Sequence, residues 1–383
     1  MKNVKRSGSA PARAARCGLQ LAIGAWVCLG AATLSGCSGS DAQAQARKGS
    51  QSTPWGAPYS NMPDIVPPNV RPDSYAPLTA EQAGPALDPA KGYRVDNLGG
   101  GVYMVGDNGY NTMFVVSDAG VILADAPPLL GAKILKAIQD VAPGVQIVKL
   151  IYSHAHLDHI GYAGEIVKTN PGMQIIAHEE TRKALVQAND ASRPVPTQTF
   201  NTQDVDFPVV VGNQILQLRY PGPNHDSGNI GIYHPGQKVL MLVDVIYPGW
   251  MMWRRLGLAT NIPGYFNLVK DMKTRWDFDK LVAGHFQVGT RADVDAQLEF
   301  MTDMHNALTE AMGTLPFADG NLNPANANNT WAAARDWIDR VTNHCVNKVT
   351  PKWSSRLGGY DVWIYEQCMA LEQSIRIDGP SLR

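Results

Sequence analysis

Short apolar runs alternate with polar segments from about residue 93 onward. The first of them predict β-strands at 101–105, 112–117, 121–125 and 146–152 and helices at 129–141 and 161–168, with apolar residues at helical spacing in the first helix. Further strands are predicted at 173–177, 214–220, 229–233, 238–244 and 280–283. Because the strands first follow one another and then alternate with helices, we expect a layered α/β body.

The chain beyond residue 285 is predicted to be helical. Residues 291–312 carry apolar side chains along one face, and a loop rich in Gly, Pro and Asn follows at 313–329. Thr330 is predicted to cap a helix at 331–346, and a last helix is predicted at 360–375. We expect this extension to cover one face of the α/β body or to mediate a homodimer.

The N-terminus has the features of an export signal. Lys2, Lys5, Arg6, Arg13 and Arg16 precede an apolar stretch at 18–34, and Gln20 and several glycines dilute that stretch. It ends in Leu34-Ser35-Gly36-Cys37, which resembles a bacterial lipoprotein lipobox. The resemblance implies cleavage before Cys37 and lipidation of its sulfur, and Ser38 after it favours the outer membrane. An ordinary cleaved signal and an uncleaved membrane segment are the alternatives.

The next segment is rich in Ser, Gln, Ala, Gly and Pro. Nine of the 26 prolines lie between Pro54 and Pro89, too many for a helix or a central strand. We therefore predict four parts: a lipoprotein signal peptide at 1–36, a tether at 37–90, a folded α/β domain at 91–312 and a helical extension at 313–383. Trp55, Tyr59 and Tyr75 are unusual in a linker, so we expect part of the tether to contact the folded body.

Net charge and cysteine content change once the signal peptide is set aside. The full chain has 33 Lys and Arg against 34 Asp and Glu, whereas residues 37–383 have 28 against 34, a net charge of −6. The chain lacks the basic excess that is typical of nucleic-acid-binding proteins. Of five cysteines, two leave with the signal and Cys37 is assigned to lipid, so Cys345 and Cys368 remain. An exported protein permits a disulfide between them, although sequence alone does not show that they meet.

The strand predicted at 146–152 leads into a dense group of metal-binding side chains. His154, His156, Asp158 and His159 follow it within six residues. In a tight loop His154 and His156 alternate and can point in the same direction. Asp158 and His159 begin the next turn and can point toward a second position nearby. Neutral imidazole and carboxylate are ligands that suit zinc. The four residues therefore predict a metal site.

In this HxHxDH order the chain resembles the metallo-β-lactamase superfamily. The resemblance continues with His225 in Pro223-Asn224-His225, Asp244 after an apolar run, and His285 in Gly284-His285. It implies an αβ/βα four-layer sandwich that holds two Zn²⁺ ions per chain, with iron or manganese as alternatives. One metal would be held by His154, His156 and His225, the other by Asp158, His159 and His285, with Asp244 bridging both. Asp125 matches the aspartate that orients the metal loop from behind the ligands.

The same ligand set narrows the expected reaction. A bridging aspartate such as Asp244 is typical of glyoxalase II-like thioesterases, lactonases, phosphodiesterases and sulfatases, whereas β-lactamases usually have Cys or Ser there. We therefore expect a zinc-dependent hydrolase in which a hydroxide held by two metals cleaves an ester, lactone or related acyl bond of a small molecule. Asp158 is the expected catalytic proton carrier. A β-lactamase, a mononuclear iron dioxygenase and a non-catalytic metal-binding lipoprotein are the alternatives.

The substrate is less well specified by the sequence. Tyr247, Trp250, Trp253 and Arg254 lie between two ligands and could line an apolar pocket in which the arginine receives a carboxylate. Packing against a helix or a subunit interface is an equal alternative for this stretch. Tyr110 and Asn111 are expected near the mouth of the site.

Overall fold

The computed structural model describes residues 75–326 and 328–380. The predicted signal peptide at 1–36, the lipidation site Cys37 and most of the predicted tether lie outside the described residues. Within the described part, no helix combines the length and apolar character that crossing a membrane requires.

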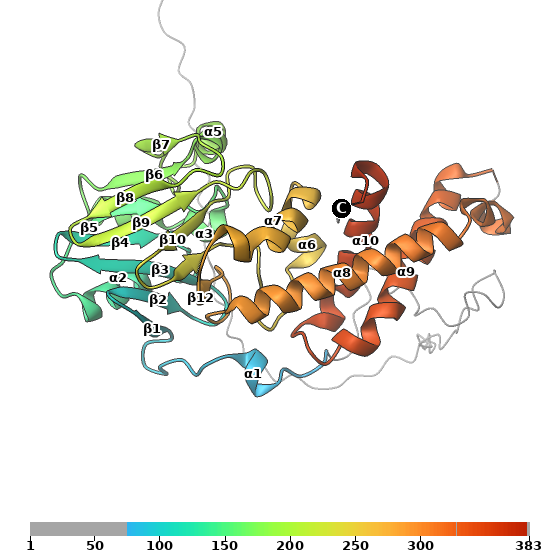
Figure 1. Ribbon diagram of the computed structural model, residues 1–383, viewed down its shortest axis with the longest axis horizontal. Helices are drawn as coiled ribbons and strands as arrows, with labels where there is room; N and C mark the ends of the chain where they lie inside the picture. The colour runs from blue at the N-terminus through green and yellow to red at the C-terminus, as the bar shows by residue number, and fades with distance from the viewer. Residues whose placement is uncertain (1–74, 327, 381–383) are drawn as a thin grey trace, which may run out of the picture. The chain divides into compact units, whose positions relative to one another are not determined.

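A seven-stranded sheet forms the first half of the body. Its strands lie in chain order: β1 (Arg94–Gly99), β2 (Val102–Gly106), β3 (Asn111–Ser117), β4 (Gly120–Ala124), β5 (Ile147–Ile151), β6 (Gln174–His178) and β7 (Gln198–Phe200). Strands β1 to β4 pair antiparallel, and β4 to β7 pair parallel. Parallel neighbours need crossover connections, and helices between the strands supply them (Figure 1).

Four helices accompany the parallel part of this sheet: α2 (Ala132–Val141), α3 (Leu157–Ile160), α4 (Ala163–Thr169) and α5 (Glu179–Ala188). The side chains of β4 alternate between the two covered faces of the sheet. Val121 and Leu123 pack with residues of α2, α3 and α4, whereas Ile122 and Ala124 pack toward the second sheet. A strand buried on both faces reads as a continuous apolar run, as residues 121–124 do.

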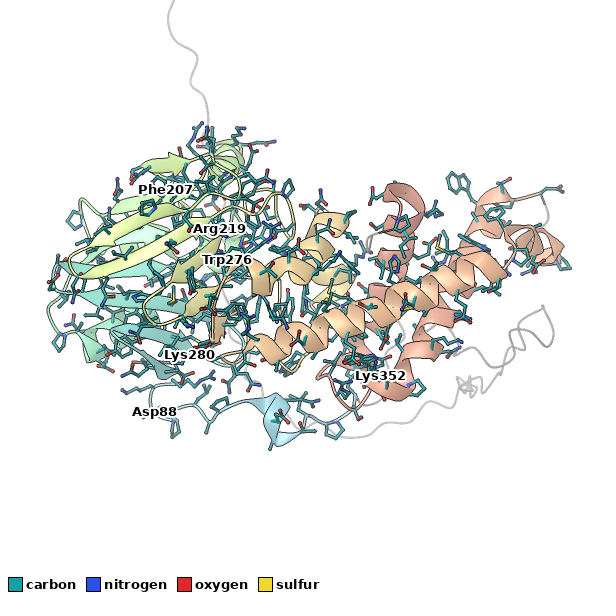
Figure 2. All side chains as sticks on the ribbon, viewed as in Figure 1. Asp88, Phe207, Arg219, Trp276, Lys280 and Lys352 are labelled. Atoms are coloured by element: carbon teal, nitrogen blue, oxygen red, sulfur yellow. A yellow bond between two sulfur atoms is a disulfide. The ribbon has the colours of Figure 1, made fainter. Side chains whose placement is uncertain are left out.

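The second sheet has five strands in the order β12 (Lys280–Val282), β11 (Val239–Met241), β10 (Gly231–His234), β9 (Gln214–Arg219) and β8 (Phe207–Val211). Its inner face, with Leu216 and Ile232, packs against the first sheet. Lys280 Nζ donates a hydrogen bond of 2.6 Å to the Leu98 carbonyl oxygen, which ties the β12 edge to β1 (Figure 2).

The helices that follow β11 are α6 (Arg254–Leu258), α7 (Ile262–Arg275), α8 (Arg291–Thr314), α9 (Thr330–Trp353) and α10 (Tyr360–Asp378). Residues of α7 and α8 share an apolar cluster with the outer face of the second sheet, whereas α9 packs on α8, and α10 packs on α9, α6 and α8. The Arg219 side chain of β9 lies over Trp276 just after α7, with 5.7 Å between the guanidinium carbon and the ring centroid (Figure 2). Helix, sheet, sheet and helix thus form the predicted αβ/βα sandwich, and the predicted helical extension is also confirmed.

The helical extension corrects two details of the prediction. Asn329, not Thr330, is the N-cap of α9, because its side chain accepts a hydrogen bond from the Ala332 backbone N–H. The helix also continues to Trp353, seven residues beyond the predicted end. Two short 3₁₀ helices, Phe317–Leu322 and Pro324–Asn326, lie in the segment predicted as a loop. A disulfide joins Cys345 of α9 to Cys368 of α10, as predicted.

Residues just before the predicted domain boundary already contact the body. The short helix α1 (Ala80–Ala83) lies there, and the Gln82 carbonyl oxygen accepts a hydrogen bond of 2.8 Å from Trp250 Nε1. The Ala76 backbone N–H donates to Asp361 Oδ2 at 2.7 Å. The folded body therefore begins before residue 91, as the aromatic residues of the tether suggested.

Candidate metal centre

The loop after β5 carries four of the predicted ligands. His154 and His159 are completely buried, whereas His156 and Asp158 are partly open to solvent. Helix α3 begins directly after His156, so one short turn places Asp158 and His159 beside the preceding loop. The hydrophobic face of this turn is held by Ile160, which is fully buried under the first sheet.

Asp125 orients this loop through Ser153. It accepts a hydrogen bond of 2.7 Å from the Ser153 backbone N–H and one of 2.6 Å from the Ser153 hydroxyl. Ser153 Oγ lies 2.9 Å from His154 Nδ1. Because the hydroxyl donates its hydrogen bond to Asp125, the serine oxygen accepts a hydrogen bond from His154 Nδ1–H, and Nε2 keeps its lone pair.

Three more predicted ligands arrive from the second sheet. His225 lies beyond β9, Asp244 beyond β11 and His285 beyond β12. Asp244 Oδ2 lies 3.0 Å from His159 Nε2 and 3.2 Å from His225 Nε2, while Oδ1 lies 3.0 Å from His285 Nε2. The carboxylate of Asp244 therefore faces histidines from three separate loops.

The seven side chains form two groups with ligand spacing. One contains His154, His156, His225 and Asp244, and the other contains Asp158, His159 and His285, with the ligand atoms of each group within 4.8 Å of one another. The grouping is the one that the family resemblance implied. Sequence positions as far apart as 154 and 285 meet here because both sheets end at this edge.

The unpaired atoms of the cluster fit divalent cations. His154 Nε2, His159 Nε2 and Asp244 Oδ1 are buried and lack a hydrogen-bond partner, which is costly for polar atoms unless a metal binds them. Burial, together with His156 and His225, lowers the pKa of His154 well below its usual range, so this imidazole is neutral. Metal ligands must be deprotonated, and His154 is held in that state.

Neighbouring histidines keep the Asp244 carboxyl ionised. Although burial opposes its charge, His159 and His225 lower the pKa of this carboxyl well below its usual range. Burial also opposes protonation of His159, but the Asp244 carboxylate outweighs it and raises the pKa of His159 to about 9. The charged forms of Asp244 and His159 therefore stabilise each other.

The turn between β2 and β3 forms one wall of the site. The Tyr110 phenol donates a hydrogen bond of 3.1 Å to Asp158 Oδ2. Asn111, which was predicted near the mouth, is instead fully buried, and its side chain bonds to the backbone of Gly284 and Phe286 on either side of His285. Asn111 therefore holds the His285 loop and does not line a substrate pocket.

The residues predicted to line a substrate pocket mainly contact other parts of the protein. Arg254 forms two hydrogen bonds to Glu366 of α10, at 2.8 and 3.0 Å, so its guanidinium already has a partner within the protein, and its role as receptor of a substrate carboxylate stays a prediction. Trp253 packs against Trp363, and Trp250 stacks on Phe286. Tyr247 is buried with its ring centroid 5.9 Å from that of His285. The stretch is mainly packing, which was the alternative reading.

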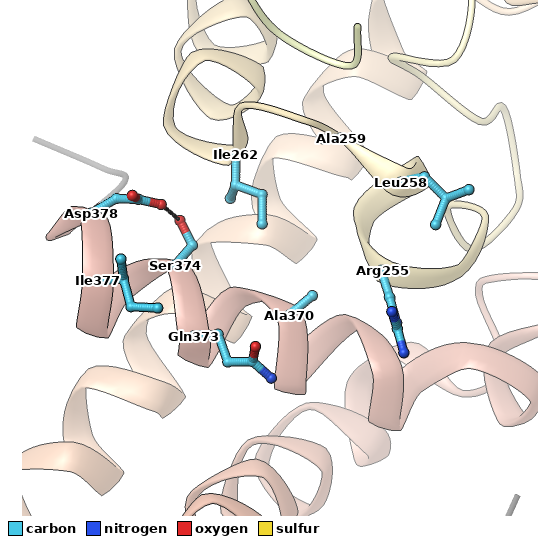
Figure 3. A pocket seen from close by; sticks show the side chains of 9 residues that line it. All are labelled: Arg255, Leu258, Ala259, Ile262, Ala370, Gln373, Ser374, Ile377 and Asp378. Carbon is cyan, nitrogen blue, oxygen red and sulfur yellow. Dashed lines mark hydrogen bonds between the residues drawn. The ribbon is translucent and has the colours of Figure 1, made fainter. Parts of the chain in front are cut away.

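A left-handed turn leads from this stretch toward the metal ligands. Residues 255–258 all have positive φ, between 52° and 66°. The turn is followed by Thr260, whose backbone N–H donates to the His225 carbonyl oxygen at 2.9 Å. An open cavity of about 340 Å³ lies between this turn and α10, with Leu258 and Ile262 on the side of the turn (Figure 3).

Two side chains next to ligands were missed by the sequence analysis. Ser153 links Asp125 to His154, and Asp226 places its Oδ2 atom 3.8 Å from His156 Nε2. Each is adjacent in sequence to a predicted ligand, which is the signal that could have identified it. Hydrogen-bonded neighbours of ligating histidines are common in metal sites.

The part of the chain that contains the predicted ligands matches a known protein family. Residues 105–285 match the model of the Metallo-beta-lactamase superfamily. The match begins in β2 and ends at His285, so it spans every predicted metal ligand.

Curated relatives are more distant. The chain is 28% identical over 213 residues to the alpha subunit of 2,4-dinitroanisole O-demethylase from Nocardioides sp. strain JS1661, covering 52% of this chain and 60% of that protein. The beta subunit is 24% identical over 285 residues, covering 71% of this chain and 78% of its own length. A hydroxyacylglutathione hydrolase from Gloeobacter violaceus is 26% identical over 165 residues, 40% of this chain and 60% of that protein.

Among solved structures, the chain is similar to a metallo-beta-lactamase from Pontibacter korlensis. The TM-score is 0.47 and the identity 19%, over 54% of this chain and 97% of that one.

Proposed function

We propose that this protein is a metal-dependent hydrolase that cleaves an ester, thioester or lactone bond of a small molecule, because residues 105–285 match the model of the Metallo-beta-lactamase superfamily. The superfamily is one of hydrolases, and the hydroxyacylglutathione hydrolases among the relatives are named for thioester cleavage. The chain spans 60% of the first curated relative, so the substrate is inferred from its own site.

The observation that carries the proposal is the position of Asp244. Its two oxygen atoms face histidines of both ligand groups, which is the arrangement required to share one carboxylate between two cations. His154, His156 and His225 would hold one zinc ion, and Asp158, His159 and His285 the other. When bound, such a pair of ions lowers the pKa of water and stabilises negative charge on a carbonyl oxygen.

Asp158 is suited to move the proton. It is the most exposed of the seven side chains, and Tyr110 occupies only its Oδ2 atom. Its carboxylate can accept a proton from the attacking water and pass it to the leaving group, after which the leaving group departs neutral. The buried Asp244 is enclosed by histidines and is not available for this transfer.

A second candidate reaction is hydrolytic cleavage of an activated aryl methyl ether. It is favoured by the match to the O-demethylase beta subunit, which extends over 285 residues and therefore beyond the superfamily domain. Aryl ethers carry no carboxylate, and Arg254, the expected carboxylate receptor, is paired with Glu366.

Metal analysis followed by a substrate panel tests these proposals. Two zinc ions per purified chain would support the hydrolase, one iron ion would support a dioxygenase, and no metal would support a scaffold. The panel should contain thioesters, lactones, aryl esters, phosphodiesters, a chromogenic β-lactam and 2,4-dinitroanisole. Turnover that is abolished by a chelator and by His154→Ala would support hydrolysis; a metal-loaded chain inert toward every acyl substrate would contradict it.

We also propose that the protein is exported and attached to the outer membrane through lipid on Cys37. The support is the sequence Leu34-Ser35-Gly36-Cys37 after a basic and apolar N-terminus. Cells expressing the full chain with labelled palmitate should yield a labelled protein in the membrane fraction, and Cys37→Ser should remove both the label and the membrane attachment. Label that persists in Cys37→Ser would refute this assignment.

A further inference from the structure

The turn between β2 and β3 is built to present one tyrosine to the metal centre. Asp107 Oδ1 accepts hydrogen bonds from the backbone N–H groups of Gly109 and Tyr110, at 3.1 and 2.8 Å. The Asp107 N–H in turn donates to the Tyr110 carbonyl oxygen at 3.0 Å. These bonds close the turn and fix the backbone that carries Tyr110.

From this turn, Tyr110 reaches Asp158. Its phenol donates a hydrogen bond of 3.1 Å to Asp158 Oδ2, across 48 positions of the chain. Asp158 is the most exposed side chain of its ligand group, and a side chain with that much freedom has several accessible rotamers. The hydrogen bond selects one of them and leaves Oδ1 free.

The same turn also holds His285. The Gly109 carbonyl oxygen lies 2.9 Å from His285 Nδ1, so that nitrogen donates its proton to the turn and Nε2 faces Asp244. The Tyr110 ring packs on His285 with 4.6 Å between ring centroids, and on His159 with 5.6 Å. Tyr110 thus contacts all three members of one ligand group: Asp158, His159 and His285.

We propose that Tyr110 is a positioning residue for this second ligand group and that it raises the metal affinity of that group selectively. The first group is organised from another direction, by Asp125 and Ser153 acting on His154. The two metal positions are therefore supported by separate parts of the fold. This inference rests on the proposed function, because it requires that both groups hold cations.

Tyr110→Phe tests the proposal because it removes only the phenolic oxygen. Zn²⁺ is titrated into the metal-free full chain against a chromophoric chelator, and the two stepwise affinities are measured. Loss of a hydrogen-bonded neighbour of a metal ligand lowers affinity by about 10- to 100-fold. We expect one affinity to fall by about 10-fold and the other to stay within about twofold.

Two ligand variants identify which affinity has changed. His285→Ala removes a ligand of the second group, and His225→Ala removes one of the first. The affinity that is weakened in Tyr110→Phe should be the one that His285→Ala abolishes. Tyr233→Phe is the matched control, because the Tyr233 phenol donates to the Asp277 carbonyl oxygen and not to a ligand. Both affinities should be unchanged in that variant.

A double variant separates positioning from general structural damage. If Tyr110 acts through Asp158, adding Tyr110→Phe to Asp158→Ala should have little further effect on the second affinity. An equal fall of both affinities, or wild-type affinity at both positions in Tyr110→Phe, would overturn the inference while leaving the hydrolase proposal intact. A wild-type chain that binds no Zn²⁺ at all would overturn both.

Discussion

Two aspartates of the metal centre have a backbone conformation that few residues adopt. Asp125 has φ of 64° and Asp244 has φ of 60°, both in the left-handed region. Each lies just past the end of a buried strand, where the left-handed residue turns its carboxylate back toward the cluster. A non-glycine residue in this region costs about 1–2 kcal/mol, and such strain is concentrated at functional sites.

Asp158→Ala tests the role of the exposed carboxylate. A positioned general acid–base group contributes about 10²- to 10⁴-fold to a rate, so we expect kcat to fall by at least about 100-fold. At least one metal should remain bound, because the first ligand group is untouched. Steady-state kinetics with metal analysis of the same sample measures both. Full activity in this variant would exclude Asp158 as the proton carrier.

Ser153→Ala tests the link between Asp125 and His154. The substitution removes the hydroxyl that accepts from His154 Nδ1 and leaves the backbone bond to Asp125 in place. We expect metal affinity at the first group to fall by about 10-fold with little change of fold. Zinc titration with a circular dichroism control checks this, and Ser192→Ala, distant in sequence from the ligands, should behave as wild type.

Helix α10 holds the backbone before the left-handed turn through one buried side chain, Gln367. Its Gln367 is completely buried, accepts from the Leu256 backbone N–H at 2.5 Å, and donates to the Met252 carbonyl oxygen at 2.6 Å. These bonds hold the segment that enters the left-handed turn at 255–258. The C-terminal extension thus fixes a backbone segment that leads, through Thr260, to the predicted ligand His225.

The same helix contains a buried acid, Glu372. Burial raises its pKa above the ordinary 4.5, and the partly exposed Arg376 offsets only part of that effect. A folded-state pKa above the unfolded value means that stability is lost as pH rises from about 4.5 through the raised pKa. Glu372 therefore destabilises the ionised protein at neutral pH.

Glu372→Gln should raise the thermal unfolding temperature at pH 7 because it removes the buried charge while keeping an acceptor for Arg376. The gain should shrink as the pH is lowered toward 4.5, where the wild-type carboxyl is protonated in both states. Thermal unfolding at several pH values measures this. A gain that is the same at every pH would show that charge is not the cause.

At the scale of the whole molecule, a disulfide cross-links two helices of the C-terminal extension to each other. The disulfide between Cys345 and Cys368 links α9 to α10 across 23 positions, and it lies next to Gln367. Disulfides form in oxidising compartments, which agrees with the proposed export. Helices α8, α9 and α10 share one apolar cluster with α7 and the outer face of the second sheet (Figure 1).

Reduction of this disulfide should lower stability. A cross-link of this length typically contributes about 2–4 kcal/mol, so a reducing agent should lower the unfolding temperature by several degrees. A Cys345→Ala/Cys368→Ala variant should start at the lower temperature and not respond to the reducing agent. Equal responses of both proteins to reduction would mean that another effect of the reagent is responsible.

Much of the fold and of the candidate site was predictable because the relevant signals are local. The apolar run at 121–125 predicts a strand, and His154 to His159 lie within six positions of the sequence. Strands β1, β7 and β8 and helices α5 and α7 were not predicted. Strand β7 is only three residues long, and the proline in β8, Pro208, argues against a strand in the sequence although a sheet edge tolerates it.

The sequence by itself determined the ligand types, their order and the class of fold, because these depend on residue identity and on periodicity along the chain. It did not determine which side chains surround the ligands. Arg254 was expected to be free but meets Glu366, 112 positions away, and Tyr110 meets Asp158. Only the tertiary structure decided these pairs, because long-range contacts depend on how two sheets and the C-terminal helices pack together.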